Sequence, residues 1–188
     1  MAPETQPSGG HSFTQLQMST TTLGIDPGTK EMGVAVLRDG RLIASGVHTL
    51  RNGDRPHDVI GQARAAILGH IRDHCPTIVA IEKPLRKATK RAALMSVIVQ
   101  ELHARSRELG LRVVELYPSE VRARAVGDPH AKKFAVARKL AERFPELWAR
   151  LPAKPPHPVL GYGHRDKYWL HMFDALAVAV ALEDPTNH

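Results

Sequence analysis

Three acidic residues of this chain lie in or directly after apolar segments, where a rigid backbone can hold a carboxylate in place. Asp26 and Glu82 each end an apolar run, and Asp174 lies within an apolar helical pattern near the C-terminus. His171 precedes Asp174 by three positions, so both share one face of a helix. Carboxylate oxygens are the preferred ligands of hard divalent cations. This set is typical of phosphodiester hydrolysis, in which two Mg²⁺ or Mn²⁺ ions neutralise charge and activate water.

Each member of the set also has a simpler explanation. Asp26 precedes Pro and Gly and could belong to a turn, and Glu82 could lie on plain surface. His171 is one of 11 histidines, some of which will lie near acids by chance. Asp166 competes with Asp174 but could be a helix cap. Burying the Asp174 carboxylate within an apolar stretch costs free energy unless it has a partner. Taken together, we expect all four residues to be catalytic metal ligands, with Asp26 bridging the two ions.

The positive charge is concentrated in the middle of the chain. The formal net charge is +7, yet residues 83–139 contain 14 Lys and Arg against 5 Asp and Glu. A basic segment beside acids favours a nucleic-acid partner, although a solvated basic surface is the alternative. Lys132 and Lys133 begin a helical pattern, where their charges interact unfavourably with the helix dipole. A nearby phosphate would offset this cost. The residues that we expect to contact phosphate here are Arg86, Lys87, Lys90, Arg91 and Lys132.

Apolar periodicity predicts five strands and four helices. The strands are 21–27, 33–38, 41–48, 77–82 and 111–116; the helices are 58–74, 88–109, 131–144 and 166–182; and 151–162 is a Pro-rich loop. Asp39-Gly40 is a strong hairpin signal, so the first three strands should be antiparallel. Helical crossovers make the later strands parallel to the first. If the fourth strand neighbours the first, Asp26 and Glu82 end at one sheet edge; neighbouring strands lie about 4.8 Å apart, so the two carboxylates could share one metal ion.

Composition limits the remaining possibilities. An apolar content of 43% supports a core, and we expect residues 1–20 to be a disordered arm before one domain at 21–188. No apolar stretch is long enough to cross a bilayer, and the N-terminus does not resemble a secretory signal. The single cysteine, Cys75, excludes an internal disulfide, and we expect it to be buried. These features favour a cytoplasmic protein with no membrane partner.

Several motifs together resemble the RuvC-type Holliday junction resolvases of the RNase H-like superfamily. The opening motif 24–28 with Gly33 resembles the one that carries the first catalytic Asp, and Ile81-Glu82 resembles the strand of the catalytic Glu. Residues 117–122, 126–127 and 131–133 are similar to the segment with DNA-contacting basic residues, and 174–179 resembles the closing helix. The resemblance covers residues 21–182, and its first and last motifs are specific mainly as a pair.

The resemblance implies an α/β RNase H-like fold with a five-stranded mixed sheet flanked by helices. It implies a homodimer that makes paired symmetric nicks in four-way DNA junctions, with two Mg²⁺ or Mn²⁺ ions, leaving 5′-phosphate and 3′-hydroxyl ends. A two-fold protein suits a two-fold junction. Arg122 and Lys133 stand where the family places basic residues near the scissile phosphate, and Lys133 is assigned to catalysis. A branch-migration partner is left open.

The chain departs from the family pattern at several positions. His171 replaces the more usual fourth acid, although some members have His, and imidazole would favour Mn²⁺ over Mg²⁺. Leu85 stands where the family has an aromatic residue, so it could wedge between bases but stack less well. Two alternatives therefore stay open: an RNase H-like nuclease for another substrate, such as RNA, and a non-catalytic junction-binding protein.

Overall fold

The computed structural model describes residues 19–51, 56–83, 89–157 and 161–183. Within these residues, five strands form one mixed sheet in the order β3-β2-β1-β4-β5. The strands are β1 (Thr21–Asp26), β2 (Glu31–Arg38), β3 (Arg41–Thr49), β4 (Ile78–Glu82) and β5 (Arg112–Leu116). The first three are antiparallel neighbours, while β4 pairs in parallel with β1 and β5 in parallel with β4. The predicted α/β fold and strand directions are confirmed.

The tight β2–β3 hairpin turns at Asp39 and Gly40, as predicted. Both residues have positive φ angles, 48° and 78°, which is the requirement of a two-residue type I′ turn. The side chain of Asp39 also accepts hydrogen bonds from the Ser19 hydroxyl and the Thr20 amide. The arm predicted at residues 1–20 lies outside the described residues, except for these last two positions.

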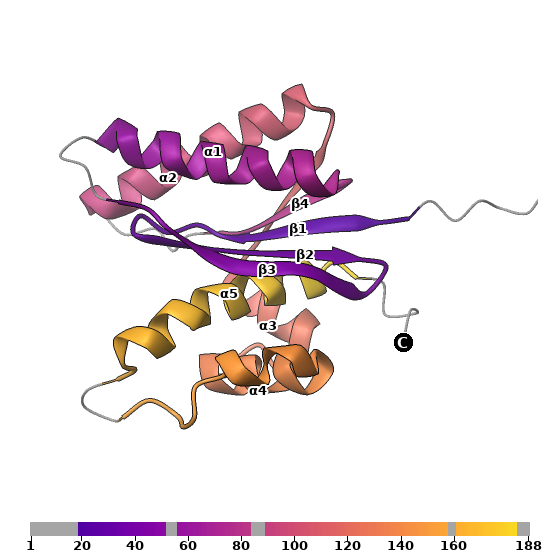
Figure 1. The fold of residues 1–188 in the computed structure, drawn as a ribbon, viewed down its shortest axis with the longest axis vertical. Helices are drawn as coiled ribbons and strands as arrows, with labels where there is room; N and C mark the ends of the chain where they lie inside the picture. Colours follow the sequence, from indigo (N-terminus) through magenta and orange to yellow (C-terminus); the bar gives the residue numbers. More distant parts are fainter. Residues whose placement is uncertain (1–18, 52–55, 84–88, 158–160, 184–188) are drawn as a thin grey trace, which may run out of the picture.

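Helices cover both faces of the sheet (Figure 1). The helices α1 (Pro56–His74) and α2 (Lys90–Glu108) lie on one face. On the other face lie α3 (Pro118–Val126), α4 (Lys133–Arg143) and α5 (His164–Val180), and a short 3₁₀ helix at Pro145–Arg150 follows α4. The sequence did not predict α3, which has nine residues and begins at a proline, a residue favoured at the first helical position.

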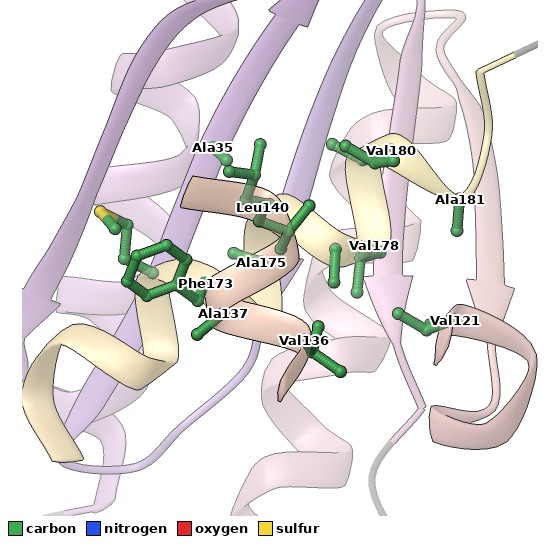
Figure 2. Close-up of a cluster of buried hydrophobic side chains, with 14 of the residues drawn as sticks. Ala35, Val121, Val136, Ala137, Leu140, Phe173, Ala175, Val178, Val180 and Ala181 are labelled. Atoms are coloured by element: carbon green, nitrogen blue, oxygen red, sulfur yellow. The ribbon is translucent and has the colours of Figure 1, made fainter. Parts of the chain in front are cut away.

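Two apolar cores lie on the two faces of the sheet. One packs β-strand residues such as Leu23 and Ile25 against α1 and α2. The other packs α3, α4 and α5 against the opposite face, and α5 is buried from Met172 through Ala181. Figure 2 shows side chains of α4 and α5, including Leu140 and Phe173, meeting in this second core. Because α5 is buried over so much of its length, its polar residues are positioned rigidly.

The expectation that Cys75 is buried is wrong. Cys75 is exposed, because it lies in the turn after α1 with a φ of 47° rather than in an element that faces a core. Gly163 is the N-cap residue of α5, and Asp166 lies in the first turn of that helix. Within the described residues, no helix combines the length and hydropathy that a bilayer crossing needs.

Candidate active site

The C-terminal ends of β1 and β4 place Asp26 and Glu82 at the same edge of the sheet. The two strands are parallel neighbours, and Ile25 pairs with Ile81. Both isoleucines belong to the core under α1 and α2. Because successive side chains alternate between faces, Asp26 and Glu82 both face α5. The sequence prediction that these two residues end at one edge of the sheet is therefore confirmed.

Two glycines allow α5 to approach the sheet closely at this edge. A Cβ atom on Gly24 would lie 2.2 Å from the carbonyl oxygen of Ala175, and one on Gly33 would lie 1.8 Å from that of His171. Gly33 is also the strand partner of Asp26. Only glycine fits where two backbones approach so closely. The glycines thus bring the middle of α5, with His171 and Asp174, close to Asp26.

Asp26, His171 and Asp174 converge into one cluster. A ligand atom from each lies within 4.8 Å of the others, and Asp174 is buried while the other two are partly buried. Two carboxylates and an imidazole are a donor set that suits Mn²⁺ and also Mg²⁺. The residues present therefore fit a divalent cation. Glu82, the fourth predicted ligand, lies near this cluster but is not part of the convergent set.

His171 lies between two acids. Its Nδ1 is 2.7 Å from Asp26 Oδ2, and its Nε2 is 3.4 Å from Glu31 Oε2. Burial alone would lower the pKa of His171, but the hydrogen bond and charge of Asp26 outweigh it and raise that pKa. The sequence analysis missed Glu31, which begins β2 directly after the turn that follows Asp26. Its position at the start of the returning strand was the available signal.

Lys133, the first residue of α4, forms an ion pair with Asp174. Burial strongly raises the pKa of the Asp174 carboxyl, although the nearby Lys133 charge opposes this. Burial acts to lower the pKa of Lys133 itself, but the charge and hydrogen bond of Asp174 raise it overall. The cation at the start of α4 therefore has a partner in the site. The ion pair places Lys133 beside the acids, while its predicted position near the scissile phosphate and its catalytic role stay predictions.

Glu82 lies in a small depression between β4, α3, α4 and α5. The depression is lined by Glu82, Pro118, Val121, Arg122, Lys133, Val136, Asp174 and Ala177. Burial is the main cause that raises the pKa of Glu82 to about 8, and the charges of Asp174 and Asp26 add to it. Without a cation, the site therefore holds more acids than it can keep ionised together.

This pKa predicts how the metal-free protein responds to pH. The folded state keeps the Glu82 proton up to about pH 8, whereas an unfolded glutamate releases it near 4.5. Between these values the folded state binds more protons, so stability should fall as pH rises from about 5 to 8. We expect Glu82→Gln to make this slope shallower, measured by urea unfolding in chelator. The exposed Glu146→Gln is the control, and equal slopes in all three proteins would contradict the assignment.

Comparisons with known proteins identify the family of this site. The family model described as crossover junction endodeoxyribonuclease RuvC matches residues 22–152. The chain belongs to the RuvC family. A search of curated protein sequences found no match. The match to the family model confirms the resemblance inferred from the motifs.

Solved structures of RuvC-family and related resolvases share the fold. Thermus thermophilus RuvC is 22% identical with a TM-score of 0.64, and the match covers 86% of this chain and 92% of that one. The structure of T. thermophilus RuvC in complex with a Holliday junction substrate is 20% identical with a TM-score of 0.63, and the match covers 86% of this chain and 91% of that one. The yeast mitochondrial Holliday junction resolvase is 13% identical with a TM-score of 0.58, covering 86% and 77%. At these identities the likeness establishes the fold, an RNase H-like five-stranded arrangement.

The predicted DNA-contacting residues of this RuvC-family chain divide into two groups. Arg122 lines the depression beside Glu82, and Lys132 is exposed immediately before α4. Leu85, Arg86 and Lys87 lie outside the described residues, as do the side chains of Lys90 and Arg91. Their predicted contacts with DNA stay predictions.

Proposed function

We propose that this RuvC-family protein is a divalent-metal-dependent endonuclease that resolves four-way DNA junctions by paired, symmetric nicks. Family membership supports a nuclease that acts on junctions. The observation that carries the proposal is the convergence of Asp26, His171 and Asp174 beside Glu82, at an edge with Arg122 and Lys133. A cluster of carboxylates that repel one another when no cation is bound is expected in a metal-dependent hydrolase.

The residues of the cluster have separable proposed roles. Asp26, His171 and Asp174, with Glu82 beside them, would hold two Mg²⁺ or Mn²⁺ ions. Bound there, such ions supply charge neutralisation at the phosphate and a more acidic water. The Asp26 hydrogen bond to Nδ1 of His171 fixes the imidazole orientation and favours protonation at that nitrogen.

The cations at the rim would act on the substrate. Arg122 can donate bidentate hydrogen bonds to a phosphate oxygen pair from the wall of the depression. Lys133 neutralises Asp174 when DNA is absent, and its side chain, which is half exposed, can turn its ammonium to the scissile phosphate when the acids bind cations. We propose a homodimer, because two symmetric cuts need two copies of a site that this chain supplies once.

Cleavage of labelled DNA by the purified chain tests the proposal. A synthetic four-way junction, a matched duplex, a flap and an RNA–DNA hybrid would each be incubated with Mg²⁺, Mn²⁺ or chelator. We expect paired nicks in the junction alone, dependent on metal, and sealed by DNA ligase because the ends are 5′-phosphate and 3′-hydroxyl. Equal cutting of all substrates would favour a general nuclease, and metal-independent binding without nicks would favour a junction-binding protein.

A further inference from the structure

An exposed aromatic ring stands beside the candidate active site. Tyr117, which directly follows β5, is 54% exposed. The ammonium of Lys83 lies 4.7 Å from the centre of the ring. Large aromatic surface is normally buried when it serves packing alone. The ring is therefore a feature that packing does not explain.

The sheet places this ring at the rim of the acidic depression. Glu82 and Leu116 are paired at the ends of the parallel strands β4 and β5, so Lys83 and Tyr117 are the next residues on each. The Lys83 amide donates a hydrogen bond to the Leu116 carbonyl oxygen at 2.8 Å, which keeps the two chains together beyond the strands. Pro118, which follows Tyr117, lines the depression together with Glu82. The ring and the ammonium thus lie one residue from the site.

Both members of the pair are held in place. The amide of Tyr117 donates to Glu120 Oε2 at 2.8 Å, and its carbonyl oxygen accepts from the Val121 amide at 3.0 Å. The ammonium of Lys83 is also 3.8 Å from Glu115 Oε2, and Glu115 in turn pairs with His103. A binding surface whose backbone and charge are fixed in advance loses less entropy when a ligand binds.

We infer that Tyr117 and Lys83 form a nucleobase-binding site at the edge of the catalytic depression. In this inference, which rests on the proposed function, the ring stacks on the base of a nucleotide next to the scissile phosphate. Aromatic rings accept any base in this way, because every base has a π-face. The Lys83 ammonium contacts the backbone phosphate of the same nucleotide. A base can reach the ring where it is unstacked, as at a branch point, and not within an intact duplex.

Substitutions at Tyr117 test this site directly. The junction would carry the fluorescent base 2-aminopurine next to the cut position, and its affinity and quenching would be measured in Ca²⁺. We expect Tyr117→Ala to weaken junction binding about ten-fold and to lose the quenching. Tyr117→Phe, which keeps the ring, should retain both. Trp148→Ala is the matched control, because Trp148 is 47% exposed but belongs to the 3₁₀ helix after α4.

The outcomes separate this inference from the proposed function. If the wild-type protein nicks junctions while Tyr117→Ala shows unchanged affinity and quenching, the nucleobase site is wrong and the function stands. Thermal unfolding of each variant identifies any general loss of structure. Lys83→Ala should reduce the slope of the logarithm of the binding constant against the logarithm of the salt concentration by about 1, as expected for the loss of one phosphate contact. An unchanged slope would overturn the assigned role of Lys83.

Discussion

An Asp26→Asn variant is expected to cleave four-way junctions roughly 10³-fold more slowly than the wild-type protein while still binding them. The substitution keeps the size of the side chain but removes its negative charge and one anionic ligand atom. Asp26 is the member of the cluster that faces His171 at 2.7 Å and is held opposite Gly33 on the sheet. The loss should therefore fall on chemistry, because the predicted DNA-contacting side chains stay intact. Single-turnover cleavage and a gel-shift assay measure the two effects separately.

The matched control is Asp73→Asn, which removes an exposed carboxylate near the end of α1 that forms an ion pair with Arg72. We expect this variant to bind and cleave like the wild type. Asp26→Asn should also lower the pKa of His171, because the hydrogen bond and the charge of the Asp26 carboxylate are the largest contributions that raise it. Wild-type cleavage by Asp26→Asn would reject the metal-binding role of this residue.

The sequence predicted much of the framework because periodicity and turn chemistry are local properties. The Asp39-Gly40 turn determines the β2–β3 hairpin, and the crossover helices make β4 and β5 parallel to β1. The placement of Asp26 and Glu82 at one sheet edge followed once the strand order was assumed. Residues 166–182 were recognisable as a helix by their apolar period, and the structure begins that helix at His164.

The missing parts depend on contacts between distant residues. Glu31 was not predicted as a neighbour of His171, because 140 positions separate them and only the approach of α5 to β2 brings them together. The exposure of Tyr117 was not predicted because the apolar strand before it suggests a core position, whereas α3 turns the chain away there. Glu82 was predicted as a ligand like the others, yet it lies beside the convergent set, where burial raises its pKa to about 8.

A Gly33→Ala variant is expected to disturb the site through the backbone, without touching a charged side chain. The added methyl group would lie 1.8 Å from the His171 carbonyl oxygen and 3.1 Å from the Met172 amide nitrogen. Neither atom is a flexible side-chain end, so α5 must move away from β2 or the strand must deform. Such overpacking typically costs about 1–3 kcal/mol, and here it also separates His171 from Asp26.

Gly46→Ala provides the comparison, because this glycine lies on the neighbouring strand β3 and a methyl group there meets nothing within 4 Å. We expect Gly33→Ala to lower the thermal unfolding midpoint by about 5 °C and to weaken Mn²⁺ binding, and Gly46→Ala to leave both near the wild-type values. Calorimetry measures both quantities on the same samples. A Gly33→Ala protein with normal stability and normal Mn²⁺ affinity would show that the close approach of α5 to the sheet does not position the cluster.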